Sequence, residues 1–130
     1  MSKLTIITNN PDVAFRYSEL SNYLETDVFH ILVAVRARVH SGARILSHPL
    51  SSSIKPNESP YKSILISLQK GRPDTRSLQL IEDAIITLKK LAVKELNSTE
   101  SILEDYRVID LDIINSAMAA LNIDYNTDSK

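Results

Sequence analysis

The chain has 130 residues, of which 43% are hydrophobic and 24% are charged, and this composition excludes an intrinsically disordered chain. Fifteen basic and sixteen acidic side chains give a formal charge of −1, so no overall positive field would attract nucleic acid or anionic lipid. Cysteine is absent, which excludes disulfides and thiolate chemistry. The longest apolar runs, such as Ile31 to Val35, are far shorter than the roughly 20 residues that cross a bilayer. The start, Met1 to Lys3, does not resemble a signal peptide, so we expect a cytoplasmic protein.

The first elements are short. Leu4 to Thr8 is rich in β-branched residues and predicts a buried strand. Asn9 and Asn10 favour a turn, and Pro11 suits the first position of a helix, which we expect over about Pro11 to Tyr17. Tyr23 to Glu25 is a candidate short strand.

The segment from Val28 to His40 fits both the period of a strand and that of a helix. Its length decides for a helix, because 13 residues is long for a strand. Thr26 or Asp27 would cap its first turn, and Gly42 would take the left-handed conformation that closes it.

Two further strands are expected at Arg44 to Ser47 and at Ser63 to Leu68, joined by a long loop over residues 47–62. Three of the five prolines of the chain lie in this loop, which disfavours a crossover helix there. Since a parallel connection normally needs such a helix, the strand from Ser63 to Leu68 should return antiparallel to the preceding one.

Asp74 should start a helix whose apolar stripe runs from Ile81 to Ala92. A final helix should begin near Asp110 or Asp112, and residues 124–130 should form a flexible tail. Together the elements predict one α/β domain over residues 1–123, with a mixed sheet of about 3–4 strands flanked by about 4 helices.

The loop over residues 47–62 is the candidate functional surface, because long loops in compact domains usually carry function or are disordered. Asn9 and Asn10 follow the first strand, and Ser47 and His48 follow the strand from Arg44. If these two strands are parallel neighbours, the polar groups converge at one end of the sheet, beside the loop. The candidate ligand-binding residues are Asn9, Asn10, His48, Ser51, Ser53, Lys55, Asn57, Glu58, Tyr61 and Lys62.

Two kinds of chemistry fit these residues. Lys55 and Lys62, together with the serine hydroxyls, could hold a carboxylate or a phosphate. Alternatively, His48 could serve as general acid or base beside a serine nucleophile, with Asn9 or Asn10 as oxyanion donor. No G-x-S-x-G motif is present, so the residues do not establish an enzyme.

Metal and nucleic-acid sites have less support. His30, His40 and His48 lack the spacing of a metal motif, and we expect neither a metal nor a cofactor. The basic group from Arg36 to Arg44 has no alternating aromatic residues, so a solvated helix face explains it better than nucleic-acid binding.

The run His48-Pro49-Leu50-Ser51-Ser52-Ser53-Ile54-Lys55-Pro56-Asn57-Glu58-Ser59-Pro60-Tyr61-Lys62-Ser63, with Ile6 to Pro11 before it, resembles the GrdX family. The resemblance covers about the first 95 residues, and Ser52 stands where the family commonly has glycine. Members are encoded beside components of glycine, sarcosine or betaine reductase in amino-acid-fermenting bacteria. The resemblance implies an accessory protein of such a system and carries over no catalytic residue.

Three hypotheses follow. The first is a binding protein that holds a small anionic metabolite, or a protein of the reductase system, through the loop. The second is an enzyme that acts on a small carboxylate or phosphate compound, and the third is a subunit that self-associates through the loop. A site that brings Asn9, Asn10, His48 and a lysine together would favour a ligand, whereas outward-facing Leu50 and Ile54 would favour a protein interface.

Overall fold

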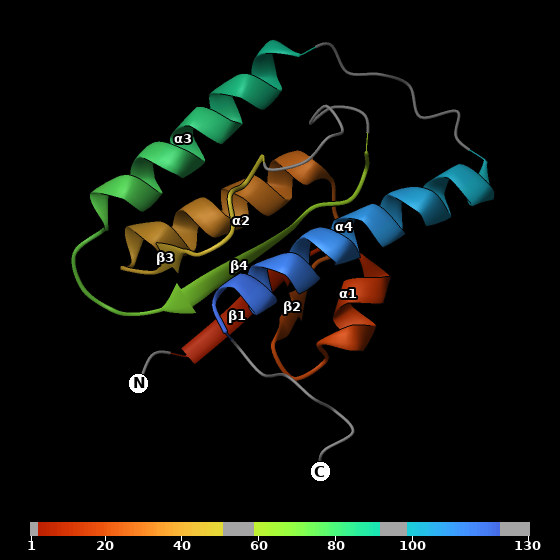
Figure 1. Ribbon diagram of the computed structural model, residues 1–130. Helices are drawn as coiled ribbons and strands as arrows, with labels where there is room; N and C mark the ends of the chain where they lie inside the picture. Colours follow the sequence, from red (N-terminus) through yellow and green to blue (C-terminus); the bar gives the residue numbers. More distant parts are fainter. Residues whose placement is uncertain (1–2, 51–58, 92–98, 123–130) are drawn as a thin grey trace.

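Strands and helices alternate along the first half of the chain in the computed structural model, which describes residues 3–50, 59–91 and 99–122 (Figure 1). The elements of these residues are β1 (Lys3–Thr8), α1 (Pro11–Arg16), β2 (Ser21–Tyr23), α2 (Val28–His40), β3 (Arg44–Ile45), β4 (Ser63–Leu68), α3 (Thr75–Lys90) and α4 (Glu100–Ala120). The predicted α/β class with a mixed four-stranded sheet and four helices is confirmed for this part of the chain. The expected tail at residues 124–130 lies outside the described residues.

The sheet has the strand order β2-β1-β4-β3. β1 and β2 are parallel, while β4 is antiparallel to both β1 and β3, so the predicted antiparallel return of β4 is confirmed. The expectation that β1 and β3 are neighbours is wrong. β4 pairs along its whole length with β1, from Lys3↔Leu68 to Thr8↔Ser63, which leaves only its other edge for the two-residue strand β3.

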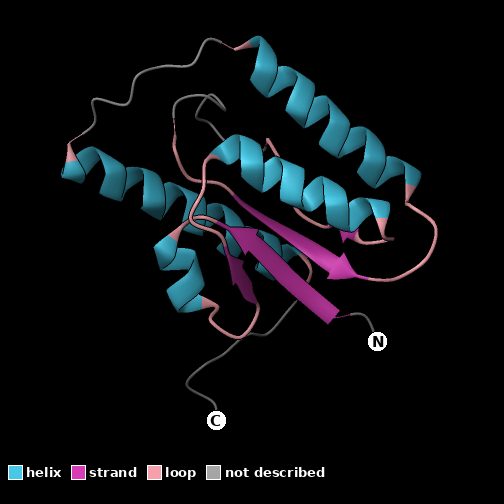
Figure 2. Cartoon of the chain, turned by 180° about the vertical axis from the view of Figure 1, so that it is seen from behind, coloured by secondary structure: helices cyan, strands magenta, loops and turns pink. Residues whose placement is uncertain are grey.

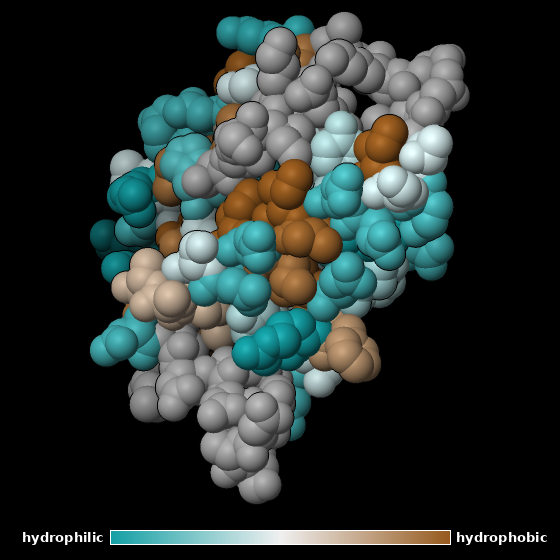
Figure 3. Space-filling model, turned by 45° about the vertical axis from the view of Figure 1, so that its right-hand side comes forward, coloured by the Kyte–Doolittle hydropathy of each residue, from teal (hydrophilic) through white to brown (hydrophobic). Residues whose placement is uncertain are grey.

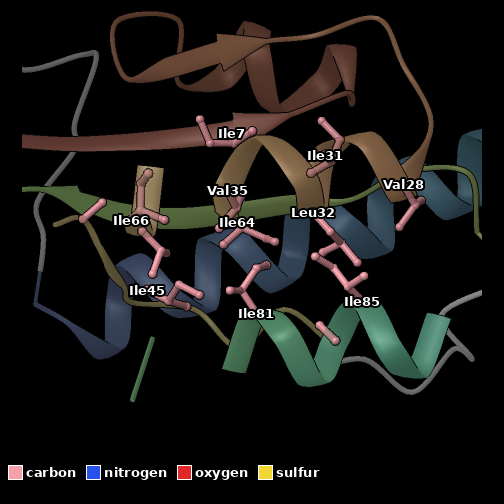
Figure 4. Packing of buried hydrophobic residues seen from close by; sticks show 13 residues of the cluster. Ile7, Val28, Ile31, Leu32, Val35, Ile45, Ile64, Ile66, Ile81 and Ile85 are labelled. Carbon is pink, nitrogen blue, oxygen red and sulfur yellow. The ribbon is translucent and has the colours of Figure 1, made fainter. Parts of the chain in front are cut away.

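Side chains alternate across the sheet and divide the core into two layers, as the period of a strand requires. One cluster joins Ile6 and Leu65 to residues of α1 and α4. The other joins Ile7, Ile64 and Ile66 to residues of α2 and α3. Figure 2 shows the helices on both sides of the sheet, and Figure 4 shows the second cluster at close range. The sheet is therefore covered on both faces.

The helix α2 has the predicted bounds, Val28–His40. Its first turn is capped by Asp27, whose carboxylate accepts a hydrogen bond from the backbone N–H of His30 at 2.9 Å. Four residues of one stripe, Val28, Leu32, Val35 and Val39, are buried. Helical spacing, and not the alternation of a strand, therefore determines which side chains of this segment enter the core.

The helix α4 begins ten residues before the predicted start at Asp110. Thr99 is its N-cap, and the Thr99 hydroxyl accepts a hydrogen bond from the N–H of Ile102 at 3.3 Å. The expected start was wrong because threonine favours both turns and N-caps, and sequence alone does not distinguish the two.

Some large apolar side chains remain at the surface, among them Phe15, Ile86, Ile102 and Val108. Figure 3 shows one face on which apolar side chains gather among polar ones. Within the described ranges, no helix combines the length and apolar character needed to cross a membrane.

Gly42, two residues after α2, lies close to the backbone of the turn that contains Gly71. Its φ angle is +113°, as the predicted left-handed closure requires, and a Cβ here would lie 2.6 Å from the backbone nitrogen of Gly71. Gly71 also has a positive φ, +137°, but a Cβ there would meet nothing within 4 Å. A side chain at either position would therefore cause backbone strain, but only a side chain at position 42 would also overlap with other atoms.

We predict that Gly42→Ala lowers the free energy of unfolding by more than the matched substitution Gly71→Ala. Both variants carry the strain of a positive φ, on the order of 1–3 kcal/mol, and only Gly42→Ala also forces two turns apart. Urea unfolding of the two variants measures the difference. Equal losses would show that the approach of the two turns contributes nothing.

Candidate functional site

Buried polar residues gather where β1 ends and β4 begins. They are Thr8, Asn9, Asn10, Lys62, Ser63 and Asp110, and we call this set the sheet-end cluster. The first three follow one another in the chain, Lys62 immediately precedes β4, Ser63 opens it, and Asp110 lies in the middle of α4. Since buried polar groups are costly unless they are hydrogen-bonded, their partners decide what each one does.

Asp110 is 5% exposed and accepts three hydrogen bonds. Its Oδ1 accepts from the backbone N–H of Ser63 at 3.1 Å, and its Oδ2 accepts from Ser63 Oγ at 2.6 Å and from Asn10 Nδ2 at 3.0 Å. Because Ser63 gives its hydroxyl proton to Asp110, the 2.6 Å contact between Thr8 Oγ1 and Ser63 Oγ is donated by Thr8. Thr8 Oγ1 in turn accepts from the N–H of Asn10 at 2.9 Å. The donors therefore all point toward one carboxylate.

Asn9 uses its whole amide group to position the chain. Its Nδ2 donates to the carbonyls of Thr26 at 2.7 Å and Pro60 at 2.8 Å, and its Oδ1 accepts from the N–H of Lys62 at 2.8 Å. Asn9 thus fixes residues 60–62 against the end of β1.

Asn10 is equally occupied. Its Nδ2 donates to the carbonyl of Arg107 and to Asp110, each at 3.0 Å, and its Oδ1 caps α1 by accepting from the N–H of Asp12. Neither Asn9 nor Asn10 has an amide proton left for a ligand, so these side chains act as braces in this structure.

Lys62 differs from the rest of the sheet-end cluster. It is 9% exposed, yet no hydrogen bond or ion pair joins its ammonium group to another of the described residues. Burial lowers the pKa of Lys62, and the negative charge of Asp110 offsets this only in part. The cluster thus holds one carboxylate that accepts hydrogen bonds on both oxygens and one ammonium group to which no other described residue gives a hydrogen bond or an ion pair.

Tyr61 and Arg107 form a contact beside the sheet-end cluster. Arg107 Nη1 donates to the hydroxyl of Tyr61 at 2.9 Å, and the same guanidinium pairs with Glu100 and lies 3.8 Å from Asp12 Oδ2. The hydrogen bonds to Glu100 and Tyr61 raise the pKa of Arg107. Arg107 therefore joins the end of the 47–62 segment to α1 and α4.

The other end of this segment is anchored separately. Ser47 Oγ accepts from the N–H of Leu65 at 2.8 Å, and Leu50 packs against the α2–α3 side of the core. His48 is exposed, and its Nδ1 accepts from the N–H of Leu50 at 3.1 Å. Leu50 therefore faces inward, unlike the residue of a protein interface.

Both ends of the 47–62 segment lie at the edge of the sheet where β1 and β3 finish and β4 begins, because β1 and β3 both run antiparallel to β4. No hydrogen bond or ion pair within the described ranges links His48 to Asn9, Asn10 or Lys62. The structure thus brings Asn9, Asn10, Tyr61 and Lys62 together and leaves His48 out of their contacts. The remaining candidates, Ser51, Ser53, Lys55, Asn57 and Glu58, and the apolar Ile54 lie outside the described residues.

Sequence reasoning missed Asp110 and Arg107 as site residues. Asp110 was read as the start of a helix, but it stands four and eight residues before Ile114 and Met118, the other buried residues of α4. A carboxylate on the buried stripe of a helix was the signal that could have identified it.

The basic group at α2 has acidic partners. Arg36 and His40 lie 3.5 and 4.0 Å from carboxylate oxygens of Glu82, and Arg44 lies 4.0 Å from Asp74. These exposed pairs contribute little to stability. Among the described residues, no three histidine or acidic side chains group as metal ligands would.

The fold and the site define a class of small α/β protein, with a four-stranded mixed sheet between two helical layers and a buried polar cluster at one end. A comparison with protein families matches the GrdX-like protein family over residues 5–119. The chain therefore belongs to this family, as the resemblance predicted. Searches of curated proteins and of solved structures gave no match.

We predict that Asp110→Asn lowers the free energy of unfolding by about 2–3 kcal/mol. Asparagine keeps the shape of the side chain, but the oxygen that accepts from Ser63 and Asn10 becomes an NH₂ group, which can only donate. Hydrogen bonds to charged groups are worth about 1.5–3 kcal/mol each. Urea unfolding measures the loss. Asp112→Asn, at an exposed position of the same helix, is the control and should change stability by less than about 0.5 kcal/mol. Equal effects of the two variants would contradict the central role of Asp110.

We predict that Lys62→Met stabilises the folded protein at neutral pH, because methionine removes a desolvated ammonium group that has no hydrogen-bond or ion-pair partner among the described residues. The pKa of Lys62 is lower in the fold than its ordinary value of 10.5. The unfolded chain thus binds more protons between these two values, and the stability of the wild type rises with pH across that window.

The wild type therefore has a lower free energy of unfolding than Lys62→Met. This difference is largest below the pKa of Lys62 in the fold, and it shrinks as pH rises toward 10.5. Thermal unfolding of both proteins over a pH series measures it. A Lys62→Met protein that is less stable than wild type at neutral pH would show that Lys62 is a structural residue.

Proposed function

We propose that this protein is a binding protein that holds a small anionic metabolite, a carboxylate or a phosphate compound, beside Lys62. The observation that carries the proposal is the burial of the Lys62 ammonium group without a hydrogen-bond or ion-pair partner in the described part of the chain. An anion placed there would complete the hydrogen bonds of Lys62 and offset its desolvation.

Charge supports an anion rather than a cation. Asp110, the acidic group that acts on Lys62, already accepts hydrogen bonds from Ser63 and Asn10. It therefore screens Lys62 only in part, and the pKa of Lys62 stays lowered. A ligand with its own negative charge would add the missing compensation.

The position of Lys62 supports a link to the 47–62 segment. The side chain of Asn9 fixes residues 60–62 through two hydrogen bonds, and Arg107 holds Tyr61. Neither brace is itself free to bind a ligand through the groups that it uses for these contacts. We infer that they preorganise Lys62, so that binding requires little ordering of this part of the chain.

Membership in the GrdX-like family supports a setting for this activity. We propose that the protein is an accessory component of glycine-reductase-type amino-acid metabolism, where small carboxylates and acyl phosphates are the anions to test first. A protein of the reductase system is the alternative occupant of the same surface.

Thermal unfolding with acetate, glycine, inorganic phosphate and acetyl phosphate tests the proposal. A bound compound at about 100 times its Kd adds about 2.7 kcal/mol to the free energy of unfolding, and the melting temperature should rise by several degrees. The rise should be lost in Lys62→Met and kept in Lys70→Met, a control at an exposed lysine after β4.

Two results would contradict the proposal. One is that none of the four compounds raises the melting temperature of the wild type. The other is that Lys62→Met and the wild type respond equally, since the anion would then bind elsewhere.

A further inference from the structure

Lys62 offers a chemistry that anion binding alone does not use. Lysine amines react with carbonyl compounds to form imines, and desolvation in an apolar site is one way in which proteins activate them. Lys62 is 9% exposed and lies one residue before β4, and burial lowers the pKa of its amine. Its burial thus fits a reactive lysine as well as an anion-binding one.

The contacts of its neighbours favour reactivity. Hydrogen bonds and ion pairs hold a lysine in its charged form, and the described residues supply neither to Lys62. Asp110, whose charge acts on Lys62, already accepts hydrogen bonds from Ser63 and Asn10. The amine is therefore not withdrawn from reaction by a partner within the described part of the chain.

We propose that Lys62 forms a reversible imine with a small carbonyl compound that also carries a carboxylate, of the α-oxo acid class; this proposal rests on the anion site proposed above. The neutral Nζ attacks the carbonyl carbon, a C–N bond forms, and the carbonyl oxygen takes the proton that the nitrogen loses. The resulting hydroxyl group then leaves as water with the second proton of the nitrogen as the C=N bond forms. Amine and carbonyl compound give imine and water, and hydrolysis reverses the step.

The proposed ligand carries a carboxylate because the imine would otherwise leave a positive charge only partly compensated. A protonated imine keeps the positive charge of Lys62 inside the fold. Asp110 compensates that charge only in part, because its oxygens already receive hydrogen bonds from Ser63 and Asn10. A ligand with its own carboxylate brings a second negative charge next to the imine, whereas a neutral aldehyde does not.

Reductive trapping tests the proposal. The folded wild-type protein is incubated with glyoxylate and sodium cyanoborohydride at neutral pH, and peptide mass spectrometry follows the carboxymethyl group that reduction leaves on each lysine. Lys70 is the internal control, because it is exposed and lies in the turn after β4. We expect the initial rate at Lys62 to exceed that at Lys70, because a lowered pKa leaves a larger fraction of the Lys62 amine neutral.

Acetaldehyde in place of glyoxylate tests the carboxylate. The preference for Lys62 over Lys70 should be smaller with acetaldehyde than with glyoxylate. An equal preference would overturn the assignment to α-oxo acids, and no preference with either compound would overturn imine formation itself. These measurements use the wild-type protein, so they do not depend on how a variant folds.

This proposal and the proposed function are distinguished by comparing the labelling of Lys62 with the stabilisation of the protein by acetate. In Lys62→Arg, which circular dichroism must show to be folded, arginine keeps the positive charge but forms no imine under these conditions, so acetate should still stabilise this variant. If Lys62 is not labelled preferentially while acetate still stabilises the wild type and not Lys62→Met, the imine is excluded and the anion site stands. If Lys62 is labelled preferentially but none of the non-carbonyl anions stabilises the protein, the anion site as proposed fails.

Discussion

The carboxylate of Asp110 joins three distant parts of the chain at one end of the sheet. It accepts hydrogen bonds from Ser63 at the start of β4 and from Asn10 at the start of α1, while its own backbone belongs to α4. The partners stand 47 and 100 residues away in the sequence. A buried carboxylate is tolerated only with such donors, so the position of α4 over the sheet and the geometry of the β1–β4 junction depend on each other.

Two kinds of interaction therefore hold α4. At its C-terminal half, Ile114 and Met118 pack with Ile6 and Leu65 in an apolar cluster that has no directional preference. At its middle, the hydrogen bonds of Asp110 and the carbonyl of Arg107 fix the rotation of the helix and its register along the sheet. Apolar burial provides the driving force for the contact, and the polar bonds select one arrangement of it.

The sequence predicted those features that local pattern decides. The length of the apolar segment, with Thr26 or Asp27 to cap it and Gly42 to close it, predicted the bounds of α2, and the run from Ser63 to Leu68 predicted β4. It failed where the outcome depends on residues far apart in the chain. The neighbours of β1 are set by the full-length pairing with β4, and the role of Asp110 is set by Ser63 and Asn10, which no spacing rule connects to it. Asn9 and Asn10 were predicted to bind a ligand, and in the structure their side chains hydrogen-bond other parts of the chain.

Asp110 and Lys62 illustrate two ways of burying a charge. Asp110 has donors on both oxygens, so its burial is largely compensated by the fold itself. Lys62 lies in the same sheet-end cluster, and the fold supplies its ammonium group with neither a hydrogen bond nor an ion pair from the described residues. A structural lysine at this place could be replaced by an apolar residue with a gain in stability, since Asn9 binds the backbone of residue 62 and not its side chain. The described residues therefore compensate the charge of Asp110 more fully than that of Lys62. This contrast supports the proposal that Lys62 binds an anion, while Asp110 holds the fold together.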